Sequence, residues 1–247
     1  MKFLRIILIS FSFLAFSSLS FAYPFYDIQF PNGEETIIRN FMGNGNIAKT
    51  VNTIEERDST YLISILEENG DITKILLKKE DLTPILNKTI SKDGKIKRYV
   101  QYLSDGKIDV SIPNKKIRKV LKVKDRGYDR FSLFYLFRGF PFRTEDKIIF
   151  DIVMHDPDNI RVVKMYVKNL GEEEIEVLAG KFRCHKLEMG CARVIDDLIW
   201  PYKYYFWFTT DSFHHFVKYQ GREMDLSILT NELESYRIGD KIRIGSH

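Results

Sequence analysis

Three Asn-Gly or Asp-Gly dipeptides divide the first half of the chain at short intervals, and they constrain its fold more than any other feature. They are Asn69-Gly70, Asp93-Gly94 and Asp105-Gly106. Asn, Asp and Gly tolerate the positive φ angles of a two-residue hairpin turn, so each dipeptide favours a reversal of the chain. β-prone runs flank the turns, at residues 60–66, 72–78 and 95–103. Because strands joined by tight turns pair antiparallel, these segments predict a β-meander.

Alternation of apolar and polar residues supports the same interpretation after the third turn. Ile108, Val110 and Ile112 alternate with polar neighbours, a pattern typical of a strand with one face toward water. Further strands are expected at residues 147–155, 160–168, 174–177, 181–187, 202–208, 216–219 and 224–235. No internal repeat, Pro-rich or Ser-rich linker, or low-complexity tract divides the chain. We therefore expect one β-rich domain, residues 23–247.

One segment, Asp129–Arg138, departs from the β pattern. Its apolar residues recur at spacings of three and four, which predicts a helix. Asp129 is expected to act as the N-cap, and Gly139 and Pro141 are expected to end the helix. The helix would be apolar on nearly every side, so we expect it to be buried. A single apolar helix in a β-meander is expected to plug or cover a curved sheet.

The first 22 residues predict export. Lys2 and Arg5 precede an apolar run, residues 6–16, and Ser20-Phe21-Ala22 supplies small residues before a cleavage point. A charged start, a short apolar segment and small residues at its end are typical of a secretory signal peptide. An uncleaved anchor is the alternative, but it would need about 20 consecutive apolar residues. We therefore expect cleavage after Ala22 and a soluble mature protein in the periplasm that begins at Tyr23.

The composition narrows the classes of partner. The only cysteines are Cys184 and Cys191, so none is available for lipid attachment at the expected cleavage site. The chain has 38 Lys and Arg against 34 Asp and Glu, and loss of Lys2 and Arg5 would leave a formal charge of +2. A nucleic-acid binder would have basic residues that are clustered and in excess. The basic run 115–119 is interrupted by an apolar residue, so we expect at most peripheral contact with a membrane surface.

Signatures of catalysis and of resident cofactors are missing from the sequence. It contains no Gly-x-Ser-x-Gly elbow and no phosphate-binding Gly-rich loop that ends in Lys-Ser or Lys-Thr. Acidic pairs such as Glu55-Glu56 and Asp196-Asp197 could supply a general acid and base, but similar pairs occur on every soluble surface. We therefore predict that the protein is not an enzyme, has no catalytic residues and uses no cofactor.

The cysteines and histidines could form a disulfide or a metal site. Cys184 and Cys191 lie seven residues apart, and the expected compartment is oxidising, so we predict a disulfide bond between them. Unpaired buried thiols and metal ligation are the alternatives. A zinc site could combine the cysteines with His185 and with His214 or His215. The spacing matches no recognised zinc pattern, and adjacent histidines would point to opposite faces of a strand, so we predict no metal site.

Aromatic residues, which make up 14% of the chain, are concentrated in the segment Trp200–Phe208. Alternation would place Tyr202, Tyr204, Phe206 and Phe208 on one face of a strand and Trp207 on the other. One interpretation is a strand buried by the core on one side and by a loop on the other. The alternative is an apolar ligand cavity that the strand lines together with the helix. The candidate ligand-binding residues are therefore Phe131, Phe134, Tyr135, Tyr202, Tyr204, Phe206 and Trp207.

Three segments of the second half resemble a family of exported bacterial proteins catalogued as domain of unknown function 3108. They are the helix Asp129–Arg138, the strand start Ala179–Leu187 and Trp207–Asp211. The resemblance implies a mainly β fold, a strongly curved antiparallel sheet or half-barrel with one apolar helix packed against its concave face. This implied fold is similar to the half-barrels of periplasmic lipoprotein carriers of the Lol type. The family usually has a proline-led strand after the acidic turn, whereas this chain has Phe213–Lys218, so the resemblance does not predict the local loop.

The expected fold could hold an acyl chain or another apolar ligand. We therefore predict a soluble periplasmic binding or carrier protein for a lipid or a lipoprotein acyl chain, without covalent chemistry. The alternative is an envelope interaction module that docks a partner protein through its sheet edge or aromatic face. A deep apolar groove would favour the carrier, and a filled concave face would favour the docking module.

Overall fold

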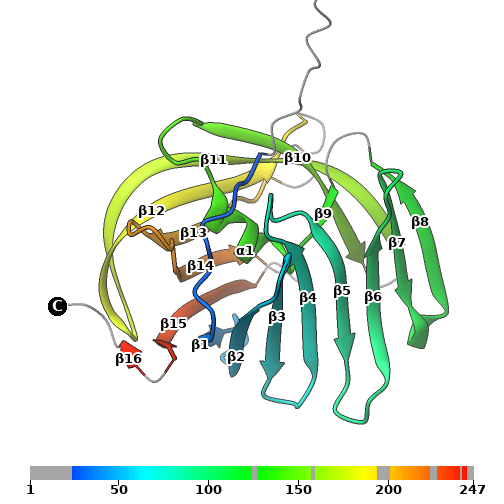
Figure 1. Ribbon diagram of the computed structural model, residues 1–247, viewed down its shortest axis with the longest axis horizontal. Helices are drawn as coiled ribbons and strands as arrows, with labels where there is room; N and C mark the ends of the chain where they lie inside the picture. Colours follow the sequence, from blue (N-terminus) through cyan, green and yellow to red (C-terminus); the bar gives the residue numbers. More distant parts are fainter. Residues whose placement is uncertain are drawn as a thin grey trace, which may run out of the picture.

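A single sheet runs through the whole described part of the molecule (Figure 1). The computed structural model describes residues 24–123, 127–156, 159–193, 201–222, 227–239 and 241–243. The predicted signal peptide and Tyr23 lie outside these residues, as do Asp196-Asp197, Trp200, Met224 and His247. No helix within these ranges is long and apolar enough to cross a membrane.

The strands and short helices follow one another along the chain in this order. They are β1 (Glu34–Phe41), β2 (Ile47–Glu56), β3 (Thr60–Glu67), β4 (Ile72–Lys78), β5 (Pro84–Ile90), β6 (Ile96–Tyr102), β7 (Lys107–Ile112), η1 (Pro113–Lys115), β8 (Ile117–Lys122), β9 (Gly127–Asp129), α1 (Leu133–Leu136), η2 (Phe137–Gly139), β10 (Lys147–Asp156), β11 (Asn159–Val177), β12 (Gly180–Cys191), β13 (Tyr204–Thr209), β14 (Phe216–Arg222), β15 (Ile228–Ile238) and β16 (Lys241–Arg243).

Nearly every strand pairs antiparallel with its neighbour in sequence. The order across the sheet is β8 to β1, then β15 back to β9, with β16 paired to β15. Antiparallel pairing of β1 with β15 therefore joins the two halves of the chain into one sheet. Among the described strands only β9 and β10 pair in parallel. The predicted mainly β fold, a curved antiparallel half-barrel with one short helix, is confirmed.

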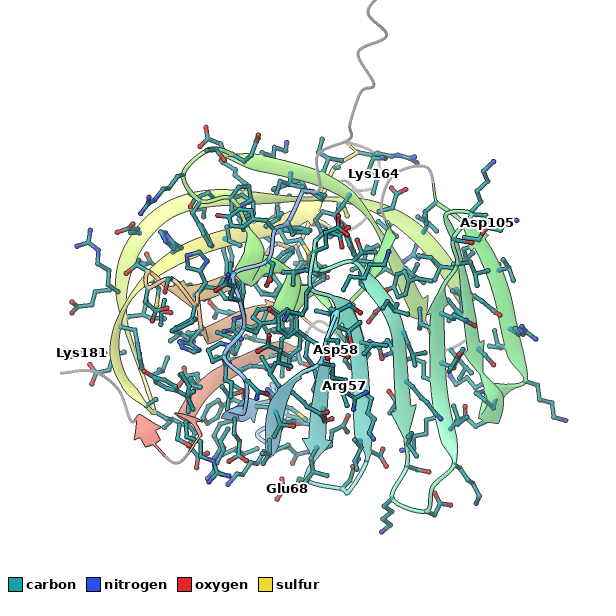
Figure 2. All side chains as sticks on the ribbon, in the orientation of Figure 1. Arg57, Asp58, Glu68, Asp105, Lys164 and Lys181 are labelled. Carbon is teal, nitrogen blue, oxygen red and sulfur yellow. The ribbon has the colours of Figure 1, made fainter. Side chains whose placement is uncertain are left out.

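The three dipeptides that open the sequence argument all form turns between paired strands. Gly70, Gly94 and Gly106 have φ angles of +87°, +82° and +73°, in the left-handed region that glycine adopts at least cost. They connect β3 to β4, β5 to β6 and β6 to β7. The first two strands, β1 and β2, are not among the segments predicted from the sequence. The charged side chains Asp105 and Lys181, labelled in Figure 2, lie at hairpin ends on the outside of the molecule.

The helix is shorter than predicted, because it begins at Leu133 rather than near Asp129. Asp129 ends β9, where it pairs with Val153 of β10. Its carboxylate nevertheless accepts hydrogen bonds from the backbone N–H of Phe131 (2.9 Å) and from Ser132 Oγ (2.6 Å), as a capping residue does. Competition from the β9 ladder therefore moves the start of the helix, and the turn before it stays tied to Asp129.

The short helical segment lies inside the curve of the sheet (Figure 1), and its apolar side chains belong to the main core. The Phe137 ring contacts Phe25, Phe150 and Phe206, with ring centroids 5.7, 6.0 and 5.0 Å away. Gly139 allows the N-terminal segment to cross at this point, because a Cβ there would lie 2.3 Å from the carbonyl oxygen of Tyr26. The helix is thus packed against the concave face, as the resemblance implies.

The sheet also overlaps itself at its ends. Val153 of β10 points away from the main core and packs with Val100, Ile108 and Val110 of β6 and β7. Lys119 of β8 donates a hydrogen bond to the carbonyl oxygen of Ile160 at 2.8 Å. Part of β9 to β11 is therefore covered on one face by the helix and on the other by β6 to β8, which explains why Val153 is buried on the face of β10 opposite to the main core.

A buried carboxylate fixes the entry to the helical segment. Asp129 accepts hydrogen bonds from Asn87 Nδ2 and Tyr102 Oη, both at 2.8 Å. Arg98, also buried, lies with its Nη1 3.7 Å from Asp129 and donates to Asn87 Oδ1 at 2.7 Å. These contacts tie the end of β9 to β5 and β6, so the helix starts from a fixed position.

A second buried ion pair fixes the exit from the helical segment. Arg138, 2% exposed, forms a bidentate pair with Glu34 of β1, 3% exposed, through two contacts of 2.9 Å. The same guanidinium donates to the carbonyl oxygen of Phe213 and packs over the Phe30 ring, with 4.5 Å from Cζ to the centroid. The Nδ1 atom of His215 lies 3.3 Å from Glu34. One side chain thus joins the helix to β1, to the N-terminal segment and to the loop before β14.

The ionised form of Glu34 is favoured by its partners. Burial alone would raise the pKa of Glu34, but the charge of Arg138 and the hydrogen bond and charge of His215 lower it to about 2. An unfolded Glu has a pKa near 4.5, so the carboxylate stabilises the fold at neutral pH. This contribution is present above pH 4.5 and is lost as the pH falls from 4.5 toward 2.

The predicted disulfide between Cys184 and Cys191 is wrong. Both thiols lie on the continuous strand β12, and the structure contains no bond between them. Seven residues of extended strand span roughly 23 Å, whereas bridged cysteines need Cα atoms about 4.4–6.8 Å apart. Because seven is odd, the side chains also point to opposite faces: Cys191 joins the main core and Cys184 joins a smaller cluster with Trp207 and Phe182.

Substitution of Glu34 by Gln tests the anchor at the end of the helix. Glu34→Gln leaves the Arg138 cation buried without its carboxylate, so we expect the free energy of unfolding at pH 7 to fall by about 3–5 kcal/mol. The difference from the unmodified protein should shrink below pH 4.5, where the carboxylate itself becomes protonated. Urea unfolding at pH 7, 5 and 3 measures both effects.

The neighbouring carboxylate on β1 provides a matched control. Glu35 pairs with Arg237 at 2.9 Å on the surface, so Glu35→Gln should cost less than about 1 kcal/mol. Equal losses for the two variants, or a loss at Glu34 that does not change with pH, would contradict the role given to the buried pair.

Alkylation tests the state of the two thiols. Protein purified without reductant, unfolded and treated with iodoacetamide should gain two carbamidomethyl groups in its intact mass. In the folded protein Cys184 should react very slowly, because burial and the nearby Glu173 and Asp211 raise its pKa to about 12. A product without alkyl groups would show that the cysteines are bridged and that β12 is not continuous.

Candidate functional site

A large cavity lies between the helical segment and the curved sheet. Its volume is about 910 Å³, near the upper end of the range for small-molecule sites, roughly 300–1,000 Å³. Side chains from β1 to β3, the helical segment and β10 to β15 line it. A packing defect would be far smaller, since an engineered cavity of about 150 Å³ already holds benzene. The concave face is therefore not filled by the core.

One wall of the cavity is apolar and adaptable. The aromatic part comes from the helix and from β13 and β14. The ring of Phe134 in the helix contacts the rings of Phe206, Phe216 and Tyr219, with centroid separations of 5.6, 5.3 and 5.5 Å. The other part comes from β10 to β12. Met154, Met165 and Met189 belong to this part of the wall. Methionine is flexible and polarisable, so this wall can follow the shape of different apolar ligands.

The opposite wall is polar and comes from β1, β2 and β15. Register places Thr36 beside Asn52 and Asn40 beside Asn231, so these side chains share one face of the sheet. The side-chain oxygens of Asn52 and Asn231 accept no hydrogen bond from the protein. An alkyl chain cannot satisfy polar groups, so an apolar ligand is expected to lie against the methionines and aromatic rings.

The cavity has a closed end and an open end. At the closed end lie the buried residues Glu34, Tyr135 and Arg138, whose ion pair is already satisfied within the protein. At the open end the lining residues are exposed to solvent: Met42, Glu68, Asn69, Arg130, Arg161 and Arg222. Figure 2 shows Glu68 at the end of the β3–β4 hairpin. A ligand would therefore enter past charged side chains and end near the helix.

The structure brings most of the predicted site residues together. Phe131, Phe134, Tyr135, Tyr204 and Phe206 all line the cavity. The helix and β13 are adjacent in space although about 70 residues separate them in the chain, as the contact between Phe134 and Phe206 shows. Their role in ligand binding stays a prediction, whereas their place around one cavity is observed.

Two predicted site residues lie elsewhere. Trp207 points to the opposite face of β13, where its Nε1 donates to Glu173 Oε1 at 2.6 Å and its ring packs with Cys184 and Val217. Tyr202 precedes β13, and its ring stacks beneath the Arg222 guanidinium at 5.0 Å, outside the cavity lining. The tip of the β11–β12 hairpin covers the outer face of β13 and makes both faces apolar, which the sequence pattern alone does not reveal.

Several lining residues are absent from the sequence prediction. Met154, Met165, Met189 and Cys191 lie on β10 to β12, and such apolar side chains suit a filled core as well as a cavity lining, so the sequence alone does not distinguish the two. The polar wall is missing as well, because β1 and β2 are not predicted. The β-branched run Thr36-Ile37-Ile38 is the signal in the sequence that could have indicated β1.

His185 and His214 lie side by side around the Phe142 ring, with their own ring centroids 5.6 Å apart. The His185 ring stacks on Phe142 with centroids 4.0 Å apart, and burial lowers its pKa. His214 bonds through Nδ1 to the carbonyl oxygen of Arg138 at 2.7 Å. Cys184 lies on the face of β12 opposite to His185, so the imagined ligand set does not converge. No group of three His, Cys, Asp or Glu side chains in the described ranges could hold a metal ion.

Comparison with known proteins shows the fold and not the family. No protein-family model and no curated protein sequence matches the chain, so the resemblance to domain of unknown function 3108 stays a prediction. Two solved structures align with TM-scores below 0.5. They are the hypothetical lipoprotein YmcC from Escherichia coli K12, with a TM-score of 0.42, and the lipoprotein LppX from Mycobacterium tuberculosis, with a TM-score of 0.23. YmcC is 9% identical to this chain, and the match covers 81% of this chain and 83% of YmcC. LppX is 10% identical, and the match covers 88% of this chain and 89% of LppX.

The fold itself is shared with a third structure. The beta-barrel-like protein of domain of unknown function DUF1849 from Brucella abortus superimposes with a TM-score of 0.56 at 14% sequence identity. The match covers 86% of this chain and 100% of that protein. The chain therefore adopts the fold of the Brucella abortus protein.

Proposed function

We propose that this protein is an extracytoplasmic carrier that binds the alkyl chain of a lipid or lipoprotein in the cavity, without covalent chemistry. The observation that carries the proposal is the cavity of about 910 Å³ between the helical segment and the sheet, with its wall of aromatic rings and methionines. The signal-peptide pattern of residues 1–22 supports a site of action outside the cytoplasm.

Binding by burial alone can supply enough free energy for a long chain. Each methylene moved out of water contributes about 0.8 kcal/mol, and association costs about 4–15 kcal/mol. A chain of roughly ten or more buried methylenes is therefore needed before binding becomes useful. Affinity for simple amphiphiles should rise steeply with chain length, and the flexible methionines accommodate differences in chain shape.

A protein-docking module is the alternative function. A filled concave face and an exposed patch would favour it. The open cavity favours the carrier, because docking through an edge or an outer face gives no reason to keep such a volume unfilled. Filling it with side chains would stabilise the fold.

A charge placed in the lining of the cavity tests the proposal. Ile65 of β3 lines the cavity beside Asn52 and packs against the core, so Ile65→Glu puts a carboxylate in the volume that a bound chain would fill. We expect the unmodified protein to take up the neutral fluorescent probe N-phenyl-1-naphthylamine, and the variant to bind it more than about tenfold less tightly.

The next residue along β3 is the matched control. Leu66 points to the other face and is 44% exposed, so Leu66→Glu should leave probe binding unchanged within twofold. Circular dichroism melts verify that both variants fold. Absence of probe uptake by the unmodified protein, or equal binding by the two variants, would refute a ligand site in the cavity.

A further inference from the structure

Basic side chains gather at the open end of the cavity. Arg130, Arg161 and Arg222 line it and are exposed, and they come from the end of β9, from β11 and from the end of β14. Lys49 of β2 lines it from the other side. Among the lining residues that the structure describes, the acidic ones at this end are Glu67 and Glu68, both at the β3–β4 hairpin. The described charged residues that β9, β11 and β14 contribute to the rim are all basic.

Register places two of the arginines on either side of one apolar residue. Asp129 of β9 pairs with Val153, so the following residue, Arg130, lies level with Met154 of β10. Met154 is in turn the partner of Arg161 on β11. Met154 belongs to the apolar wall. Two guanidinium groups thus flank the outer end of the surface on which a chain would lie.

Two of the guanidinium groups lie over aromatic rings. Arg130 Cζ lies 4.8 Å from the centroid of the Phe131 ring, and Arg222 Cζ lies 5.0 Å from that of Tyr202. A ring that packs on the face of a guanidinium does not block its N–H donors, because all of them point outward in the plane of the group. In that plane the donors can bind two oxygens of a carboxylate or phosphate at once.

We propose that the cavity selects an alkyl chain with an anionic head group, a carboxylate or a phosphate, which the rim of Arg130, Arg161 and Arg222 binds while the chain lies on the methionine and aromatic wall. This inference rests on the proposed function and names its ligand class. It also sets a direction: the chain enters first, and the head group stays at the mouth. The closed end does not compete for the anion, because Arg138 there is already neutralised by Glu34.

Probe displacement with matched amphiphiles tests the ligand class. The protein is purified in the form that the cell exports and is loaded with N-phenyl-1-naphthylamine. It is then titrated at pH 7.5 with hexadecanoate, hexadecyl phosphate, hexadecanol and the methyl ester of hexadecanoate. All four carry the same chain length, and only the first two are anions. We expect the anions to displace the probe at concentrations at least about tenfold lower, as one charge-assisted hydrogen bond implies. Their advantage should shrink as ionic strength rises.

Arginine variants locate the head group. Arg161→Gln and Arg222→Gln should each weaken displacement by hexadecanoate about five- to tenfold and leave displacement by hexadecanol within twofold. Arg183→Gln is the control, because Arg183 is exposed on β12, pairs with Glu172 at 2.8 Å and is not part of the cavity lining. It should change neither ligand.

The outcomes separate this inference from the proposed function. If the probe binds but hexadecanol displaces it as well as hexadecanoate does, the cavity is a site for apolar chains and the anionic rim is refuted. If sodium acetate or inorganic phosphate alone displaces the probe at the concentrations at which hexadecanoate does, the rim binds free anions, and the proposal of an amphiphilic ligand is refuted. If no probe binds, the proposed function fails and the inference fails with it.

Discussion

The buried pair of Arg138 and Glu34 is the interaction on which the arrangement of this molecule depends. It holds the helical segment inside the sheet by directed contacts to β1, to the N-terminal segment and to the loop before β14. A buried ion pair is seldom more stabilising than well-packed apolar side chains, but it specifies position. A helix fixed in this way does not need apolar contact on every side. The space beside it can therefore stay open without loss of a defined structure.

The sheet provides the second constraint, because it curves far enough to overlap itself. Register shifts between Ile37 and Ile38, between Asn169 and Glu172 and between Trp207 and Phe208 bend strands that line or adjoin the cavity. The overlap of β6 to β8 with β10 and β11 then covers the back of the apolar wall. Asp129 lies where the overlap and the helix meet, and its bonds to Asn87 and Tyr102 join them. The cavity wall is thus supported from behind and is expected to keep its shape without a ligand.

The sequence predicts local features of this fold better than long-range ones. Turn chemistry at Gly70, Gly94 and Gly106 and alternation in β7 identify strands correctly, because both depend on neighbouring residues. The predicted start of the helix is wrong, since Asp129 both ends a strand and accepts the capping hydrogen bonds. The disulfide is wrong because the strand predicted at residues 181–187 continues without a break to Cys191, which nothing in the local sequence indicates. Both errors come from pairing partners that are distant in the chain.

The candidate site follows the same rule. Phe131, Phe134, Tyr135, Tyr204 and Phe206 could be named because aromatic density is visible in the sequence, and all five line the cavity. Trp207 lies on the face opposite to Phe206, as alternation predicts, and is buried there because the β11–β12 hairpin folds back over the sheet and Ala179 donates a backbone hydrogen bond to the carbonyl oxygen of Leu233 on β15 at 3.0 Å. The methionines and the arginine rim have no local signature. They become recognisable only when the sheet brings their strands together.

Photo-crosslinking tests most directly whether the cavity is the ligand site. A fatty acid with a diazirine near the middle of its chain can be bound, irradiated and mapped by mass spectrometry of peptides. The account predicts crosslinks to residues of the apolar wall such as Phe134, Met165 and Met189. Crosslinks confined to exposed apolar residues on the outer surface, such as Val120, Ile149 and Leu178, would contradict it.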